Sequence, residues 1–274
     1  MSKLLESSKL VVPSKEQPEQ DGNILRITPE SANWKYVGFE VYQLKEGQVF
    51  EKETHDQEMA VVLLSGLANA TTKLQSLNQI GKRMSVFEKT PAYTVYIPND
   101  DAIKIEALTH LEIAVCTAPG KGTYEARLIS PEDVEVANRG SGSMQREIHN
   151  ILPENKHADS LFVIEVFTPQ GNWSSFPPHK HDQDNLPHET YLEETYYHKI
   201  NPADRGFAIQ RVYNDDRSLD ETIVVKDGQV VLVPEGYHPV SAPPGYDLYY
   251  LNVMAGPIRK WQFTNDKDHE WLMK

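Results

Sequence analysis

The sequence predicts an all-β protein built from two β-sandwich or barrel domains in tandem. Short segments with alternating or continuous apolar character recur along the chain, and turn residues separate them. No segment shows the length and periodicity of a long helix. The second half also repeats the order of features found in the first half, which indicates that one domain was duplicated.

The predicted strands fall into two groups with a polar stretch between them. They cover residues 38–44, 59–64, 93–98 and 111–116 in the first half, and residues 161–167, 207–213, 221–225, 229–233 and 249–254 in the second. Residues 7–22 are polar and predict a poorly packed arm, while residues 130–142 end in Gly-Ser-Gly and predict a linker. We therefore predict an N-terminal arm over residues 1–22, one domain over residues 23–142 and another over residues 143–274.

The duplication is visible as features that share the same order and similar spacing in the two halves. The matching pairs are Gly47 and Gly171, His55 and His179, residues 39–42 and 164–167, and residues 95–98 and 231–234.

Composition narrows the class of protein. The 274 residues are 39% hydrophobic, so a packed core can form. The net charge of −13 argues against nucleic acid or an anionic membrane as the main partner, but a few local cations can still bind a small anionic substrate. No apolar run approaches the roughly 20 residues that span a bilayer, and the N-terminus lacks a signal-peptide core, so the cytoplasm is the expected location. The single Cys116 excludes an internal disulfide and lies in a predicted buried strand, where we interpret it as structural.

Three segments of the second half carry residues that suit a metal ion. His179 and His181 lie at positions i and i+2, which point to one face of an extended strand. Glu194 begins a later predicted strand, and His238 follows a Pro-x-Gly turn at the end of another. Three imidazoles and one carboxylate suit zinc, manganese or ferrous iron, and we predict one divalent ion, with zinc as the first choice.

Each of these features has an ordinary explanation when it is taken alone. An isolated His-x-His pair is often a pair of surface or packed histidines, and a glutamate at the head of a strand is usually solvated. Their combination and order favour a metal site. The identity of the carboxylate ligand stays open, because Glu193, Glu189 and His188 lie near Glu194. We prefer Glu194, since it points to the same face of the predicted strand as Tyr196.

This arrangement resembles the two motifs of the cupin superfamily. Gly171-x7-His179-x-His181 followed by Glu194 is similar to the first motif, and Gly228-x5-Pro234-x-Gly236-x-His238 is similar to the second. The gap before Glu194 is longer than usual, which implies an inserted loop, and the gap between Gly236 and His238 is one residue shorter. The resemblance implies a bicupin fold of two jelly-roll barrels.

The sequence is also similar to a narrower family, the 5-deoxy-glucuronate isomerases of bacterial myo-inositol catabolism, which are related to the 5-keto-4-deoxyuronate isomerases. The likeness runs through nearly the whole chain and is most specific in residues 149–152, 176–182, 192–197 and 233–239. It implies a metal-dependent aldose–ketose isomerase that converts 5-deoxy-D-glucuronate to 5-dehydro-2-deoxy-D-gluconate. The alternatives are a 5-keto-4-deoxyuronate isomerase, an iron cupin dioxygenase and a non-catalytic sugar-binding cupin. A homo-oligomer is compatible with any of them.

Isomerisation of a uronate requires a proton shuttle and a cation for the substrate carboxylate. The shuttle candidates are Glu193, Tyr196, His198 and metal-bound water. Arg211 is the candidate for the carboxylate, because an unpaired charge among apolar strand residues is costly. Lys180 is a weaker candidate, since strand alternation points it away from the two histidines.

The first half lacks an equivalent donor set. His55 keeps the place of His179, but Gln57 replaces His181, and Ala102 stands where His238 would be. We therefore predict that the first half serves as a packing partner or as half of an interface.

Overall fold

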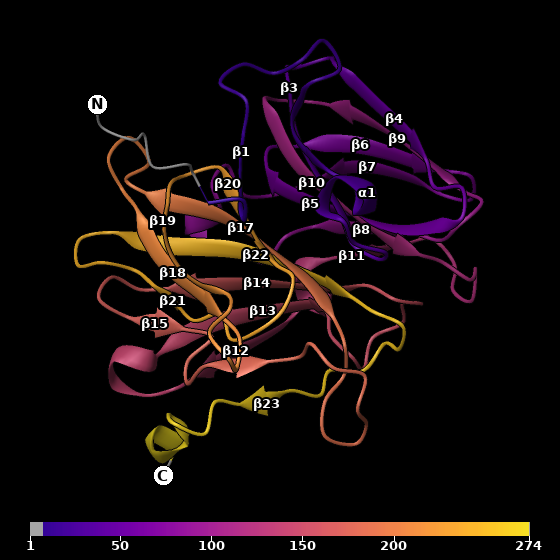
Figure 1. Ribbon diagram of the computed structural model, residues 1–274. Helices are drawn as coiled ribbons and strands as arrows, with labels where there is room; N and C mark the ends of the chain where they lie inside the picture. The colour runs from indigo at the N-terminus through magenta and orange to yellow at the C-terminus, as the bar shows by residue number, and fades with distance from the viewer. Residues whose placement is uncertain (1–7, 274) are drawn as a thin grey trace, which may run out of the picture.

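The chain folds into two lobes of antiparallel strands, which the computed structural model describes over residues 8–273. Figure 1 shows the first lobe in indigo to magenta and the second in salmon to yellow. The described residues contain one α-helix, the single turn α1 (Pro29–Ala32), so the expectation of no long helix is confirmed. Across residues 8–273, no helix combines the length and apolar character needed to cross a bilayer.

The first lobe is a sandwich of two sheets. Its elements are β2 (Asn23–Ile27), β3 (Gly38–Leu44), β4 (Val49–Glu53), β5 (Gln57–Ser65), β6 (Ala68–Thr72), β7 (Ser76–Ile80), η1 (Val86–Glu88), β8 (Thr94–Ile97), β9 (Ala102–Ala107), β10 (Leu111–Pro119), β11 (Arg127–Ile129) and η2 (Pro131–Asp133). A six-stranded sheet has the order β11-β8-β5-β10-β3-β2, and a four-stranded sheet has the order β4-β9-β6-β7. Apolar side chains from both sheets fill the space between them.

The second lobe repeats this plan. Its elements are β12 (Glu135–Arg139), η3 (Gly142–Met144), β13 (Arg146–Leu152), β14 (Phe162–Thr168), β15 (Trp173–Ser174), β16 (His179–Lys180), β17 (Glu193–Asn201), β18 (Ala208–Tyr213), β19 (Asp220–Val225), β20 (Gln229–Val233), β21 (Val240–Ser241), β22 (Asp247–Ala255), β23 (Thr264–Asn265) and η4 (Glu270–Met273). The seven-stranded sheet begins with β1 (Val11–Pro13) and has the order β1-β20-β17-β22-β14-β13-β12. It faces the four-stranded sheet β15-β21-β18-β19. All nine strands predicted from the sequence are present, because each has the apolar pattern of a buried or half-buried strand.

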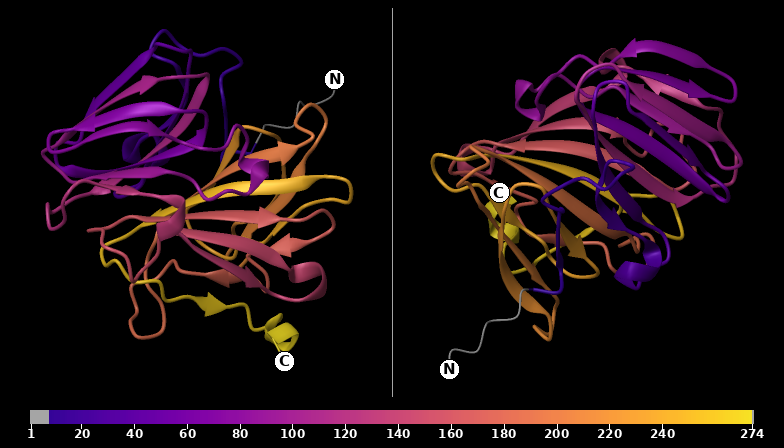
Figure 2. Two further views of the ribbon diagram at one scale, coloured as in Figure 1. Left: turned by 180° about the vertical axis from the view of Figure 1, so that it is seen from behind. Right: turned by 90° about the horizontal axis from the view of Figure 1, so that it is seen from above.

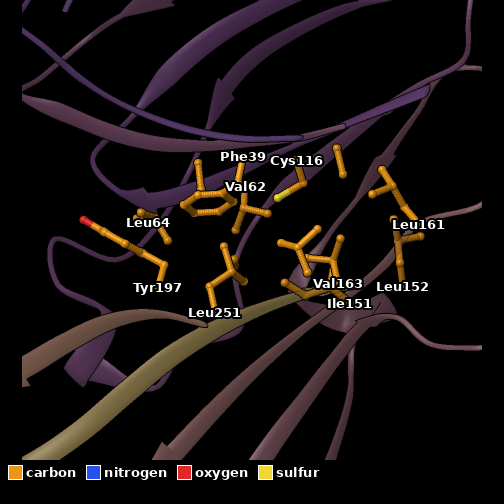
Figure 3. Close-up of a cluster of buried hydrophobic side chains, with 14 of the residues drawn as sticks. Phe39, Val62, Leu64, Cys116, Ile151, Leu152, Leu161, Val163, Tyr197 and Leu251 are labelled. Carbon is orange, nitrogen blue, oxygen red and sulfur yellow. The ribbon is translucent and has the colours of Figure 1, made fainter. Parts of the chain in front are cut away.

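The two large sheets pack against each other through a shared apolar core. Figure 3 shows Phe39 and Cys116 of the first lobe opposite Val163 and Leu251 of the second. These side chains are fully buried, and each contributes about 1.5–3 kcal/mol relative to an exposed position. Burial also raises the pKa of the Cys116 thiol, which fits the structural role expected for it.

In one strand, the structural repeat differs by one residue from the match that the sequence predicted between the two halves. Phe39 pairs with Cys116, and Val163 pairs with Val253, and all four belong to the shared core. Ile164 belongs instead to the core inside the second lobe. The match of residues 39–42 with 164–167 is therefore wrong by one position, because both strands are apolar on both faces and the pattern alone does not fix parity.

Two segments expected to lie outside the sheets join the seven-stranded sheet at its edges. In the predicted arm, β1 (Val11–Pro13) pairs with β20, so this part is not poorly packed; residues 1–7 lie outside the described residues. In the predicted linker, β12 pairs with β13. The polar composition of both segments suits edge strands, which are half solvated. We retain the division into residues 1–22, 23–142 and 143–274 as a proposal.

Two buried carboxylates join the lobes in a reciprocal way. Glu193 of β17 accepts hydrogen bonds from the backbone N–H groups of residues 35–37 at 2.8, 2.8 and 3.0 Å. Glu58 of β5 accepts bonds from the backbone N–H groups of residues 159–161 at 2.7, 2.6 and 2.6 Å. Glu58 lies opposite Ala118 of β10, as Glu193 lies opposite Ala255 of β22, so the two acids occupy equivalent positions of the repeat.

Candidate metal centre

The candidate metal centre lies inside the second lobe, between its two main sheets. His179 is the first residue of β16, Glu194 is the second residue of β17, and His238 lies in the turn between β20 and β21. His181 follows β16 at the start of the inserted loop. Strands from different parts of the chain thus bring the four predicted ligands together.

The three imidazoles converge on one point, and Glu194 contacts two of them. The ring nitrogens that His179, His181 and His238 offer lie within 4.8 Å of one another. Glu194 Oε2 lies 3.1 Å from the Nε2 atoms of both His181 and His238. Glu194, His181 and His238 are each at most 3% exposed, which is rare for such groups unless they are paired or bind a metal.

Backbone carbonyls set the tautomers of two of the histidines. His181 Nδ1 donates to the Leu192 carbonyl at 3.1 Å, and His238 Nδ1 donates to the Gly236 carbonyl at 2.9 Å. Each neutral ring therefore carries its proton on Nδ1 and presents the lone pair of Nε2 to the centre. His238 Nε2 is buried and has no hydrogen-bond partner among residues 8–273, which fits an atom placed to bind a metal.

The electrostatics of the centre also suit ligation. Burial lowers the pKa values of His179 and His238 to about 3, so both rings are neutral near pH 7, the form that binds metals. Burial likewise opposes a charge on His181, but the hydrogen bond and charge of Glu194 outweigh it and raise the pKa of His181. A cation between Glu194 and the histidines would take the place of that proton.

The alternative ligands named above point elsewhere. Glu189 accepts hydrogen bonds from the backbone N–H groups of Asp182 and Gln183 at 2.7 and 3.1 Å, so it holds the inserted loop. His188 is exposed on that loop. Glu193 lies on the opposite face of β17, in the contact with residues 35–37. Of the acids considered, Glu194 is the one that reaches the histidines.

A cavity of about 170 Å³ opens onto the centre and is lined by His179, Glu194 and Tyr196. The C-terminal segment forms part of its wall through Trp261, Phe263, Asn265 and Met273, and it lies on the side of the second lobe that faces away from the first (Figures 1 and 2). Pairing of β23 with β16 holds this segment beside His179. Sequence reasoning missed this wall, because no local pattern indicates which distant segment will cover a cavity.

Tyr196 lines the cavity, whereas His198 does not. The Tyr196 hydroxyl is 2.9 Å from Ser175 Oγ, and burial with the nearby charge of Glu194 raises its pKa well above the usual value. Tyr196 is therefore protonated at neutral pH, and its hydroxyl has a proton to donate. His198 is bonded to Gln210 at 2.9 Å, is absent from the cavity lining, and has a pKa lowered to about 4 by burial.

Two of the residues that the sequence analysis proposed as catalytic lie away from the cavity. Glu193 faces the first lobe, so it cannot serve as the proton shuttle. Arg211 Nε and Nη2 donate to the two carboxylate oxygens of Asp220, each at 2.7 Å, on the exposed side of β18. On β18 the Gln210 side chain points inward and the Arg211 side chain points outward. The sequence does not reveal which residues of this strand point inward, because apolar residues flank Arg211 on both sides. Arg139 and Arg146 line the cavity instead, and sequence reasoning did not single them out.

Within residues 8–273, the positions of the first lobe that correspond to the candidate ligands carry no matching donor set. Met59 pairs with Ile97 as Glu194 pairs with Val233, so methionine replaces the carboxylate. The His55 side chain is 76% exposed, beyond the reach of any buried centre. The lack of a metal site in the first half, expected from Gln57 and Ala102, stays a prediction.

Comparison with known proteins identifies the family. Residues 10–272 match the profile of the KduI/IolB family. The chain belongs to this family. The 5-deoxy-glucuronate isomerase of Geobacillus kaustophilus is 66% identical over 267 residues, which cover 97% of this chain and 96% of the relative. The 5-deoxy-glucuronate isomerase of Bacillus subtilis strain 168 is 49% identical over 249 residues, covering 90% and 92%.

Solved structures agree with this assignment. The crystal structure of an IolB-like protein from Salmonella typhimurium superposes with a TM-score of 0.95 at 50% identity and covers 97% of this chain and 100% of its own. The oxalate decarboxylase of Lactobacillus farciminis, in its formate complex, gives a TM-score of 0.66 at 14% identity over 94% of this chain and 88% of its own. The latter likeness concerns the fold alone. The predicted fold class, an all-β bicupin, is confirmed.

The position of Glu193 leads to a first prediction. Glu193→Gln should reduce stability by about 1.5–3 kcal/mol, because a neutral amide weakens the charge-assisted bonds to residues 35–37. The turnover number and the metal content should remain close to wild type. Thermal unfolding, steady-state kinetics and elemental analysis measure the three quantities, and Glu58→Gln at the equivalent position of the first lobe is the matched variant. A hundredfold drop in turnover with unchanged stability would restore Glu193 to the catalytic site.

Proposed function

We propose that the protein is a metal-dependent aldose–ketose isomerase that converts 5-deoxy-D-glucuronate to 5-dehydro-2-deoxy-D-gluconate, as part of myo-inositol breakdown. The observation that carries this proposal is the convergence of His179, His181 and His238, with Glu194 against two of them, beside a cavity in a KduI/IolB protein. The names of relatives up to 66% identical supply the substrate.

The metal is proposed to be held by the three imidazoles and Glu194. When bound, a divalent ion supplies a Lewis acid that polarises the substrate carbonyl and the neighbouring hydroxyl. We take zinc as the first choice, because imidazole nitrogen and carboxylate oxygen are ordinary zinc ligands, and manganese and ferrous iron accept the same donors.

The isomerisation moves two protons between adjacent positions of the sugar acid. The C2–H bond breaks and a proton adds at C1, while the proton of the C2 hydroxyl moves to the C1 oxygen. C2 therefore becomes the carbonyl carbon, C1 carries the hydroxyl, and the overall composition is unchanged. Tyr196 is protonated and lines the cavity beside His179 and Glu194. We therefore propose that its hydroxyl donates a hydrogen bond to the oxygen on which negative charge develops. Ser175 holds that hydroxyl in place.

The C-terminal segment gives the cavity an apolar wall through Trp261, Phe263 and Met273. Apolar side chains beside the reacting carbons reduce the access of water to an enediol-like intermediate, which limits its side reactions.

The test is to incubate the purified protein with 5-deoxy-D-glucuronate and follow the appearance of the ketose by NMR. We expect turnover that a chelator abolishes and that an added divalent metal restores. Elemental analysis identifies the ion in the active sample, and 5-keto-4-deoxyuronate serves as the competing substrate. Faster turnover of that second uronate, or activity that persists in demonstrably metal-free protein, would contradict the proposal.

A further inference from the structure

Two arginines lie side by side in the wall of the cavity without an acidic partner. Arg139 of β12 is directly opposite Arg146 of β13 in the register of the two strands. Both side chains line the cavity that holds His179 and Glu194. Arg139 is exposed and Arg146 is half-buried; like charges directly opposite each other on neighbouring strands are destabilising, so an anion bound between them would provide compensation.

Protein groups do not provide that compensation. Among residues 8–273, neither guanidinium forms an ion pair with a carboxylate, whereas Arg83 and Arg211 each do. Arg146 Nη1 donates to the backbone carbonyls of Met144 and Phe176 at 3.0 and 3.3 Å. Those bonds fix the guanidinium, while its Nε and Nη2 groups have no hydrogen-bond partner in the described part of the chain. A guanidinium whose Nε and Nη2 groups are free can donate two parallel hydrogen bonds to one carboxylate.

Strand parity explains why Arg146 reaches the cavity. Arg146, Ile148 and Asn150 alternate along β13 and all three line the cavity. Arg146 is half-buried, and burial lowers its pKa, with the neighbouring Arg139 charge acting in the same direction. The positive charges of both arginines also contribute to the lowered pKa of His179, so the pair and the candidate metal centre share one electrostatic environment.

We propose that Arg146, assisted by Arg139, forms an anion-binding subsite that holds the carboxylate of an open-chain sugar acid while its other end reaches the candidate metal centre. This inference rests on the proposed function and adds to it the residue that selects acids over neutral sugars. In 5-deoxy-D-glucuronate the reacting C1 and C2 atoms and the C6 carboxylate lie at opposite ends of the chain. The arginine pair and the candidate metal centre, which reaches the cavity through His179 and Glu194, are the two polar features of its wall that match those ends.

The kinetic test compares 5-deoxy-D-glucuronate with its C6 amide, which removes the charge and keeps the shape. In wild type we expect the acid to be preferred. In Arg146→Met the KM for the acid should rise roughly 10- to 100-fold, the range expected for a lost charge-assisted hydrogen bond, while kcat changes far less. The preference over the amide should collapse. Arg211→Met is the matched control, because Arg211 pairs with Asp220 on the outer surface, and it should keep the wild-type preference.

A binding test separates this inference from the proposed reaction. Calorimetry with D-gluconate and D-gluconamide compares an acid with a neutral analogue and needs no turnover. If the wild type fails to isomerise 5-deoxy-D-glucuronate, the reaction is wrong, but loss of the gluconate preference in Arg146→Met still supports the subsite. If Arg146→Met retains the wild-type preference for the acid in both experiments, the subsite is overturned.

Two milder variants cover the case in which Arg146→Met does not fold, as judged by circular dichroism. Arg146→Lys keeps the charge but loses the planar fork, and Arg139→Met removes only the assisting cation. Each should weaken the preference for the acid by a smaller factor than the loss of Arg146. Wild-type preference in both folded variants would overturn the proposal.

Discussion

His238→Ala should abolish isomerase activity, with a loss of at least about 10³-fold in kcat. His238 contributes a buried Nε2 to the candidate centre, and that atom has no other partner in residues 8–273. A metal ion provides several kcal/mol of stabilisation to a developing oxyanion, and each 1.36 kcal/mol corresponds to a factor of ten in rate. The measurements are kcat with 5-deoxy-D-glucuronate and metal content by elemental analysis.

The control for His238→Ala is His55→Ala. His55 occupies the place of His179 in the first lobe, but its side chain is 76% exposed and no donor set surrounds it. His55→Ala should keep both the metal and the activity. If His238→Ala keeps a full complement of metal and wild-type turnover, the assignment of the centre is wrong, and the reaction must take place elsewhere in the chain.

Arg83→Met should destabilise the fold by about 3–5 kcal/mol, because it removes the cation that balances the buried charge of Glu165. Arg83 is 2% exposed and pairs with Glu165 in the contact between the lobes, where Tyr249 also donates to Glu165 at 2.8 Å. Two further bonds of Arg83 reach the carbonyls of Leu64 and Thr90, each at 2.9 Å. Urea unfolding measures the effect, and Arg211→Met on the surface should change stability by less than about 1 kcal/mol.

The same ion pair gives the destabilisation a defined pH dependence. Burial opposes ionisation of Glu165, but the charge of Arg83 outweighs it and lowers the pKa of Glu165 from 4.5 to about 2. The folded state therefore binds this proton more weakly than the unfolded state, and the contribution is fully present above about pH 4.5. The difference between wild type and Arg83→Met should shrink as the pH falls from 4.5 towards 2. A difference that stays constant over that range would show that Glu165 is not the group responsible. Arg83→Met/Glu165→Leu should recover much of the lost stability, because an apolar pair of similar volume needs no compensation.

The candidate ligands could be predicted because each depends on local spacing. The i, i+2 relation puts His179 and His181 on one face, and the Pro-x-Gly turn places His238 at the end of β20. Glu194 was separable from Glu193 by strand parity, and the structure places the two on opposite faces of β17. The preferred ligand was therefore the acid that reaches the histidines, although the same parity was not applied to Glu193 as a proton shuttle.

The errors share one cause, which is that apolar strands in this protein are buried on both faces. Parity cannot be read from hydrophobicity in such a strand, so Arg211 was placed in the cavity when it lies outside, and residues 39–42 were matched one position out of register. Arg146 lies only a few residues after the predicted linker, in a segment whose polar neighbours gave no indication of a buried surface.

The amino-acid sequence was sufficient for the fold class, the repeat and the four metal-binding candidates, since these follow from strand periodicity and motif spacing over a few residues. Only the folded chain decided that Glu193 and Glu58 join the lobes, that the C-terminal segment covers the cavity, and that Arg139 and Arg146 face it. Those features arise where strands distant in sequence become neighbours. The order and register of the sheets determine them, and no local pattern encodes that information.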